Sequence, residues 1–279
     1  MASAANSMTV SAAGPASVQA LIAGPLRPAR VLGSFPTAVY LRLEGGDVVA
    51  VLTRDAVRLP LGLVIAARSP ELPLNTLPGP VQVGESEVRI GRWIARLARL
   101  VSVDAPRGIV PDRVAVERAW RRLGPFEASD PDPAPLRDLL RGPGGPQAAA
   151  DLARRMLGGG SGLTPSGDDV LAGFLVGGWS FGVALEPLRA AVLAAAPTAT
   201  TDLSAALLRC ASRGEAIPEV GALATVLSAS GADGERAVGE EVDGALARLV
   251  EVGHTSGQAL ATGLVAAACV ASRPAAATT

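Results

Sequence analysis

Strand patterns and helix patterns occupy different halves of this chain, and their separation limits the folds that it can adopt. Short runs of β-branched and aliphatic residues, bounded by glycine turns, fill the part from Arg30 to about Val103. After residue 150 the sequence is helical, and no strand alternates with the helices. Because parallel sheets are built from alternating strands and helices, this order argues against a kinase or dehydrogenase fold. The sequence predicts an α+β protein in which a β-rich barrel or sandwich domain precedes an all-helical domain.

The N-terminal half contains one clear hairpin. Residues 38–43 and 48–53 are β-rich runs separated by Gly45-Gly46. Further strands are expected at 61–67, 81–83 and 87–90. We therefore expect a flexible tail over residues 1–25, followed by a β-rich domain over 26–105.

The remainder is expected to be a connector followed by the helical domain. The connector covers residues 106–146, with short helices at 111–123 and 135–141, and its part from 125 to 146 is rich in proline, glycine and aspartate. The domain over 147–279 carries the expected ligand site. Its helices are expected at 147–157, 168–184, 187–196, 202–213, 219–230, 234–252 and 257–272.

Composition excludes several classes of function. The net charge of −1 and the aromatic content of 3% argue against a nucleic-acid partner. The absence of lysine rules out a Walker-type lysine and a lysine Schiff base. The apolar runs at 170–185 and 257–272 are shorter than the ~20 residues that span a bilayer, and the N-terminus lacks the features of a signal peptide. We expect no membrane partner and a cytoplasmic location, which suits two cysteines in apolar contexts.

The segment 158–169 carries the strongest functional signal. It reads Gly-Gly-Gly-Ser-Gly-Leu-Thr-Pro-Ser-Gly-Asp-Asp, and an apolar run begins directly after it. A glycine-rich loop can bring several N–H groups to a ligand, and the following helix adds the positive end of its dipole. This order predicts a site for phosphate or carboxylate. The expected anion-binding residues of this segment are Gly160, Ser161, Gly162, Thr164, Ser166 and Gly167.

Two adjacent acids stand beside this expected anion site. Asp168 and Asp169 could hold a divalent metal or act as a base, and no other cofactor is indicated. The alternative is structural: Ser166 or Asp168 caps the helix, and the dipole favours acids in its first turn. On that interpretation the glycine-rich loop is a linker.

A second segment, 253–257, repeats the arrangement before the last apolar run. Its sequence Gly-His-Thr-Ser-Gly adds Thr255, Ser256 and Gly257 to the expected anion-binding residues. His254 joins Asp168 and Asp169 as a catalytic candidate, since an imidazole pKa near 6.5 suits acid–base chemistry. The alternative for His254 is a structural hydrogen bond.

Small residues indicate how the two segments come together. Gly173 follows Ser166 by seven residues, and Gly263 follows Ser256 at the same spacing. Two helices with glycine faces can pack closely and bring their N-termini to one ligand. In a third segment, Thr201 and Ser204 are expected mainly to cap a helix, while remaining within reach of the pocket.

The motif at 162–169, followed by Leu171-Ala172-Gly173, resembles the signature of the AllH family, which is associated with oxamate carbamoyltransferase. The blocks 253–257 and 201–204 are similar to the family's second and intermediate motifs, and residues 34–61 to its strand region. The resemblance implies a role in allantoin-type nitrogen breakdown, where carbamoyl phosphate and oxamate interconvert with oxalurate and phosphate. It also implies a small anionic ligand, such as carbamoyl phosphate or oxamate, and hetero-oligomeric partner subunits.

Two other interpretations remain open. Residues 164–169 are also similar to the Gly-Ala-Gly-Asp anion-hole motif of ribokinase-type sugar kinases, in which an Asp deprotonates the substrate hydroxyl. Asp169 or Asp168 would then be the base of a phosphotransferase, although the helical half does not match that α/β fold. The third interpretation is a non-catalytic subunit that holds an anionic metabolite.

Overall fold

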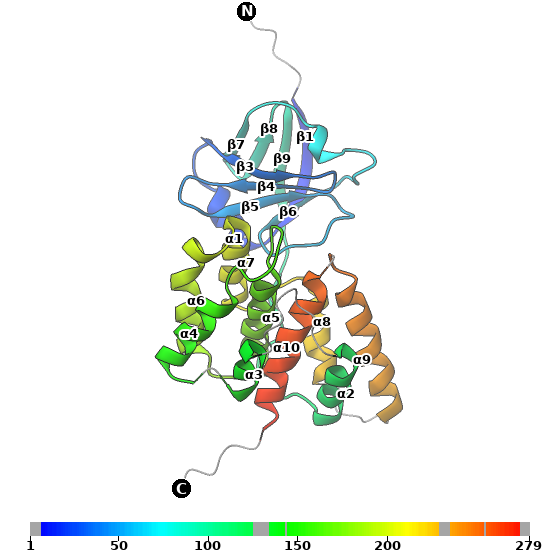
Figure 1. The fold of residues 1–279 in the computed structure, drawn as a ribbon. Coiled ribbons are helices and arrows are strands. Elements are labelled where there is room, and N and C mark those ends of the chain that lie inside the picture. Colours follow the sequence, from blue (N-terminus) through cyan, green and yellow to red (C-terminus); the bar gives the residue numbers. More distant parts are fainter. Residues whose placement is uncertain (1–6, 125–133, 143, 229–234, 254, 274–279) are drawn as a thin grey trace, which may run out of the picture. The chain divides into compact units, whose positions relative to one another are not determined.

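The computed structural model describes residues 7–124, 134–142, 144–228, 235–253 and 255–273. It forms two compact units, a β unit over Met1–Val103 and a helical unit over Asp104–Thr279 (Figure 1). The chain is therefore α+β, as the separation of strand and helix patterns predicts.

The β unit is built on one nearly closed nine-stranded sheet rather than on two packed sheets. Its strand order is β2-β7-β8-β9-β1-β6-β5-β4-β3. Neighbouring strands are antiparallel except for the pairs β1–β9 and β5–β6, which are parallel. The strands are β1 (Met8–Gly14), β2 (Arg27–Pro28), β3 (Arg30–Ser34), β4 (Ala38–Arg42), β5 (Val48–Leu52), β6 (Gly62–Ile65), β7 (Val81–Gly84), β8 (Glu87–Ile90) and β9 (Trp93–Leu100).

The predicted hairpin is confirmed as β4 and β5, which pair from Ala38 with Leu52 to Arg42 with Val48. Gly46 adopts a φ of 86° in the connecting turn, a conformation that costs glycine little. The turn between β7 and β8 instead uses two non-glycine residues, Glu85 and Ser86, at positive φ.

The expected flexible tail over residues 1–25 is wrong for its described part. Residues 8–14 form β1, which lies between β6 and β9. Residues 16–22 form the helix α1 (Ala16–Ile22), whose Val18 and Ile22 enter the core of the β unit. The small side chains of this segment give a weak strand signal in the sequence, and the strand is stabilised by pairing with a neighbouring strand on each side.

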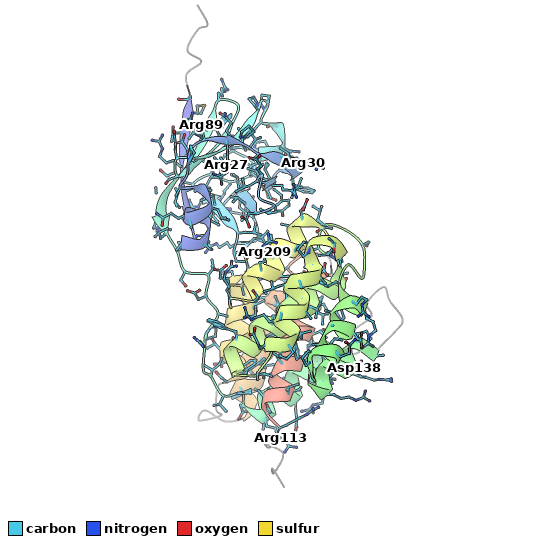
Figure 2. The ribbon with its side chains drawn as sticks, turned by 90° about the vertical axis from the view of Figure 1, so that its left-hand side faces the viewer. Arg27, Arg30, Arg89, Arg113, Asp138 and Arg209 are labelled. Carbon is cyan, nitrogen blue, oxygen red and sulfur yellow. The ribbon has the colours of Figure 1, made fainter. Side chains whose placement is uncertain are left out.

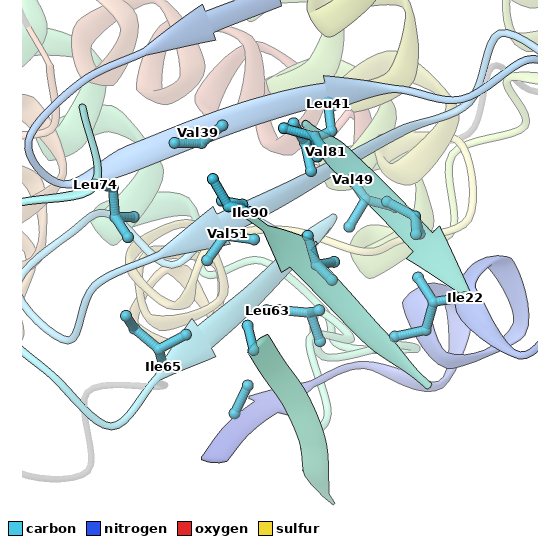
Figure 3. Close-up of a cluster of buried hydrophobic side chains, with 14 of the residues drawn as sticks. Ile22, Val39, Leu41, Val49, Val51, Leu63, Ile65, Leu74, Val81 and Ile90 are labelled. Carbon is cyan, nitrogen blue, oxygen red and sulfur yellow. The ribbon is translucent and has the colours of Figure 1, made fainter. Parts of the chain in front are cut away.

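The core of the β unit consists of aliphatic side chains on one face of the curved sheet. Figure 3 shows Ile22 of α1 together with inward side chains of β4, β5, β6, β7 and β8. A short 3₁₀ helix, η1 (Leu74–Thr76), adds Leu74 to this cluster. Burying such side chains removes apolar surface from water, which stabilises the sheet.

The helical unit contains nine α-helices in its described residues. They are α2 (Arg113–Leu123), α3 (Ala134–Arg141), α4 (Pro146–Met156), α5 (Ser166–Phe181), α6 (Glu186–Ala199), α7 (Asp202–Ala211), α8 (Pro218–Leu227), α9 (Glu235–Val250) and α10 (Ser256–Ala271). Each lies within three residues of a predicted helix at both ends. None of the described helices is both long and apolar enough to cross a bilayer.

Helix α5 is buried on almost every side and lies against α10 (Figure 1). Two glycines make this contact possible. A Cβ added to Gly173 would collide with the carbonyl oxygen of Leu260, and one added to Gly263 would collide with that of Val170. The expected glycine-faced packing is confirmed, and it brings the two backbones into direct contact.

Charged side chains of the helical unit form ion pairs at its surface. Asp138 of α3 accepts hydrogen bonds from Arg141, at 3.1 Å, and from Arg155 of α4, at 2.5 Å (Figure 2). Both pairs are partly exposed and contribute little to stability individually, and the pair with Arg155 links α3 to α4.

Candidate functional site

Asp168 is a buried acceptor that ties three segments together. Its Oδ1 accepts a hydrogen bond from the backbone N–H of Gly158, at 2.8 Å. Its Oδ2 accepts from the hydroxyls of Thr200 and Ser204, the latter at 2.7 Å. With 1% of its surface exposed, Asp168 holds the loop after α4 and the α6–α7 junction against the start of α5. Both carboxylate oxygens are therefore occupied by donors within the protein.

Asp169 is buried beside Asp168 but has a different environment. It is 6% exposed, and its Oδ2 has no hydrogen-bond partner among the described residues. Burial raises the pKa of Asp169 to about 7, the Ser256 hydroxyl opposes this rise, and the charge of Asp168 adds to it. Asp169 therefore lies within reach of the first residue of α10, and its pKa suits proton exchange near neutral pH.

Hydroxyl groups connect the N-termini of α5 and α10. Thr164 and Ser256 lie 3.1 Å apart between Oγ1 and Oγ, and either atom can be the donor. Ser166 Oγ and Thr255 Oγ1 lie 3.5 Å apart, at the limit of a hydrogen bond. The two expected segments thus meet, and their hydroxyls lie around the start of both helices.

The glycine loop folds back on the start of α5. Gly160 has a φ of 113°, and a Cβ there would come within 2.8 Å of the Ser166 backbone nitrogen. Gly160, Ser161 and Gly162 are exposed. By contrast, Gly167 donates its N–H to the Gly159 carbonyl at 2.8 Å, and that donor already has an acceptor within the protein.

The third segment caps a helix, as expected, and also supports the loop. Thr201 Oγ1 accepts from the backbone N–H of Ser204, at 3.1 Å, at the start of α7. The same hydroxyl donates to the carbonyl of Leu163, at 2.6 Å. Thr201 therefore holds the glycine loop at Leu163, while Ser204 contributes to the site by its hydrogen bond to Asp168.

The capping part of the structural alternative is wrong, whereas its second part stands, since both acids lie in the first turn of α5, where the helix dipole favours them. The N-cap position of α5 is Pro165 and that of α10 is Thr255, and neither makes a side-chain cap bond. Ser166 and Asp168 lie inside the first turn of α5. The Asp168 carboxylate bonds to other segments instead of to its own helix start.

The remaining expected residues give a mixed outcome. Gly257 is buried, and a Cβ there would collide with the carbonyl oxygen of Leu249. His254 lies outside the described residues, so its place beside the acids stays a prediction. Within the described part of the chain, no group of three or more His, Cys, Asp or Glu side chains is arranged to hold a metal.

Sequence analysis did not identify two residues that donate hydrogen bonds to Asp168. Gly158 supplies an N–H to Asp168, and Thr200 supplies a hydroxyl. Thr200 directly precedes the expected Thr201, so the run of threonines before α7 was the available signal. Which threonine faces Asp168 depends on the geometry of the α6–α7 junction, which spacing alone does not specify.

Comparison with protein families matches residues 156–268 to a model described as oxamate carbamoyltransferase subunit AllH. The matched residues contain the glycine loop, both acids and the starts of α5, α7 and α10. The resemblance is confirmed for these residues, while that of residues 34–61 stays a prediction. Searches of curated proteins and of solved structures gave no match.

Proposed function

We propose that this chain is a component of an oxamate carbamoyltransferase-like enzyme, because its residues 156–268 match the AllH family model. Its role in the complex is to bind a small anionic substrate where the N-termini of α5 and α10 meet. The observation that carries this proposal is Asp169, a buried acid whose Oδ2 lacks a partner among the described residues beside the start of α10. A buried polar atom without a partner is costly, and a ligand that supplies one is favoured.

The surrounding groups suit a small carboxylate or carbamoyl compound. Thr164, Ser166, Thr255 and Ser256 offer hydroxyls that can donate to oxygen and accept from an amide N–H. The two helix N-termini attract negative charge. Oxamate, oxalurate and carbamoyl phosphate each present oxygens and an amide nitrogen within a few bonds, which matches a short row of hydroxyls.

The two acids have separate roles in this proposal. Asp168 is a positioning residue, because its oxygens are occupied by Gly158, Thr200 and Ser204. Asp169 is the acid that meets the ligand. The family description names a subunit, so partner subunits complete the enzyme and take part in the transfer itself.

The direct test is carbamoyl transfer by the purified complex of this chain with its co-expressed partners. Oxalurate and phosphate should yield carbamoyl phosphate without ATP, measured by trapping the product with an excess of ornithine transcarbamoylase. Asp169→Ala should raise KM for oxalurate at least tenfold, since it removes a ligand contact. Asp151→Asn, an exposed change on α4, is the matched control and should leave the kinetics unchanged.

Two results would favour the other functions. ATP-dependent phosphorylation of a sugar by the isolated chain would overturn carbamoyl transfer in favour of a kinase. Tight oxamate binding by the chain, with no carbamoyl transfer in any partner complex, would leave a metabolite-binding subunit as the function.

A further inference from the structure

The charges around Asp169 leave little net positive charge for an anionic ligand. Each helix N-terminus carries about half a positive charge. The starts of α5, α7 and α10 together therefore balance about one and a half negative charges, and buried Asp168, which accepts from Ser204 at the start of α7, already supplies one. If Asp169 were ionised as well, an entering carboxylate would meet excess negative charge in a buried setting.

Among the described residues, no basic side chain is one of the groups that shift the pKa of Asp169. Besides burial, the groups that set the pKa of Asp169 are the Ser256 hydroxyl and the Asp168 carboxylate. Helix α10 carries no acidic or basic residue. The charged residues on the other helices packed against α5 are Asp151, Arg154 and Arg155 of α4, Asp202 and Arg209 of α7, and Glu219 of α8.

His254 is the remaining titratable group near this junction in sequence, and it lies outside the described residues. An unperturbed imidazole has a pKa near 6.5, which is close to the pKa of Asp169. Any test of proton coupling must therefore separate the two side chains by substitution.

We propose that Asp169 is protonated when a ligand binds, and that its Oδ2 hydroxyl donates a hydrogen bond to a carboxylate or carbonyl oxygen of that ligand. An anionic ligand thus enters together with a proton, and the pair is neutral. This assignment satisfies the buried Oδ2 atom and removes the excess negative charge in one step. It rests on the proposed ligand site but not on carbamoyl transfer.

The consequence is a defined pH dependence of affinity. With a pKa of about 7, Asp169 is protonated below neutral pH, so the Kd for a monoanion should be constant there. Above pH 7 the proton must first be taken up, and the Kd should rise by up to tenfold per pH unit. At pH 8 binding should take up close to one proton per ligand.

Calorimetry on the full chain, with oxamate and oxalurate as the probes, tests this at pH 6, 7, 8 and 9. The binding enthalpy at pH 8 should vary with the ionisation enthalpy of the buffer. Asp169→Asn keeps a donor of the same shape without a titrating proton, so its Kd should be independent of pH. His254→Gln should retain the pH dependence, and the control Asp151→Asn should match the unmodified protein.

Three outcomes would overturn the inference: a flat Kd with no proton uptake, a pH slope that persists in Asp169→Asn, or no binding of either probe at any pH. Failure of the proposed function is separate. An active complex with pH-independent binding contradicts only the inference, whereas proton-linked binding without carbamoyl transfer contradicts only the proposed function.

Discussion

Both units of the chain bury carboxylates, and the surroundings of Glu87 in the β unit differ from those of Asp169 in the helical unit. Glu87 in the β unit is 2% exposed and accepts hydrogen bonds from Arg89, at 2.5 Å, and Arg96, at 2.8 and 3.0 Å. Burial raises the pKa of Glu87, but the hydrogen bonds and charges of the two arginines outweigh it, so the pKa is lowered overall. In the helical unit, burial dominates and the pKa of Asp169 is raised to about 7.

The difference separates a structural acid from one that is available for chemistry. Paired Glu87 stays ionised and joins β8 to β9, whereas Asp169 is held next to the satisfied Asp168 with one oxygen left over. Perturbed acids that lack a protein partner are candidates for function, while paired ones are more often structural. Stability measurements on each unit test whether the two acids differ in this way.

The largest effect is expected for Asp168→Ala. The change leaves the Gly158 N–H and the Thr200 and Ser204 hydroxyls without their acceptor. Loss of three bonds to a buried charge should destabilise the helical unit by about 3 to 5 kcal/mol. Hydrogen exchange of α5 and α7 peptides, followed by mass spectrometry, measures the loss in this unit alone. Unchanged protection of α5 would mean that Asp168 does not hold the junction.

Asp169→Asn should instead stabilise the helical unit at pH 8. The native group binds a proton up to about pH 7, whereas the unfolded one ionises near 3.8, so stability falls as the pH rises between these values. A shift of this size corresponds to at most ~4 kcal/mol, and we expect about 2 kcal/mol of gain because the amide also lacks a partner. The gain should shrink toward pH 5 in urea unfolding. A stability loss at pH 8 would contradict the absence of a protein partner for the Asp169 Oδ2 atom.

Glu87→Gln should destabilise the β unit by about 1 kcal/mol at pH 7, since Arg89 and Arg96 are 35% and 57% exposed and water screens the pairs. The lowered pKa of Glu87 contributes stability above its unfolded pKa, which is lost as the pH falls through the folded value. The stabilities of the variant and of the native protein should therefore become equal at low pH. Hydrogen exchange of β8 and β9 reports this, and equal protection at pH 7 would show that the pairing is not stabilising.

The smallest effect is expected for Thr164→Val, which removes one hydroxyl but keeps the shape. Half-buried Thr164 loses its bond to Ser256, worth about 0.5 to 1 kcal/mol. Oxamate affinity should fall more than stability, because the hydroxyl faces the proposed ligand. Thr76→Val in the β unit also removes a surface hydroxyl bond and serves as the control. Equal affinity in the two variants would remove Thr164 from the site.

The sequence specified the helical unit better than the β unit. Periodicity and glycine or proline boundaries located α2 to α10, because these signals are local. Strand β1 was not predicted, because small residues such as Thr9, Ser11 and Ala13 are also typical of an unstructured tail. Its strand conformation depends on pairing with β6 and β9. At the site, the order of hydroxyls and acids predicted which segments meet. It did not predict that Asp168 and Asp169 differ, since this depends on donors from Gly158 in the loop after α4 and from Thr200 at the α6–α7 junction.

The backbone contact between α5 and α10 also bears on the entropy of binding. Because Gly173 and Gly263 each rest on a carbonyl of the opposite helix, neither helix can slide or rotate without a collision. The hydroxyls at the two helix starts are then fixed before any ligand arrives, so little conformational freedom remains to be lost on binding. On a preorganised surface of this kind, a small ligand binds more tightly, because less of the free energy of its contacts is offset by ordering the protein. At the proposed site, the two glycines would therefore raise affinity without contacting the ligand.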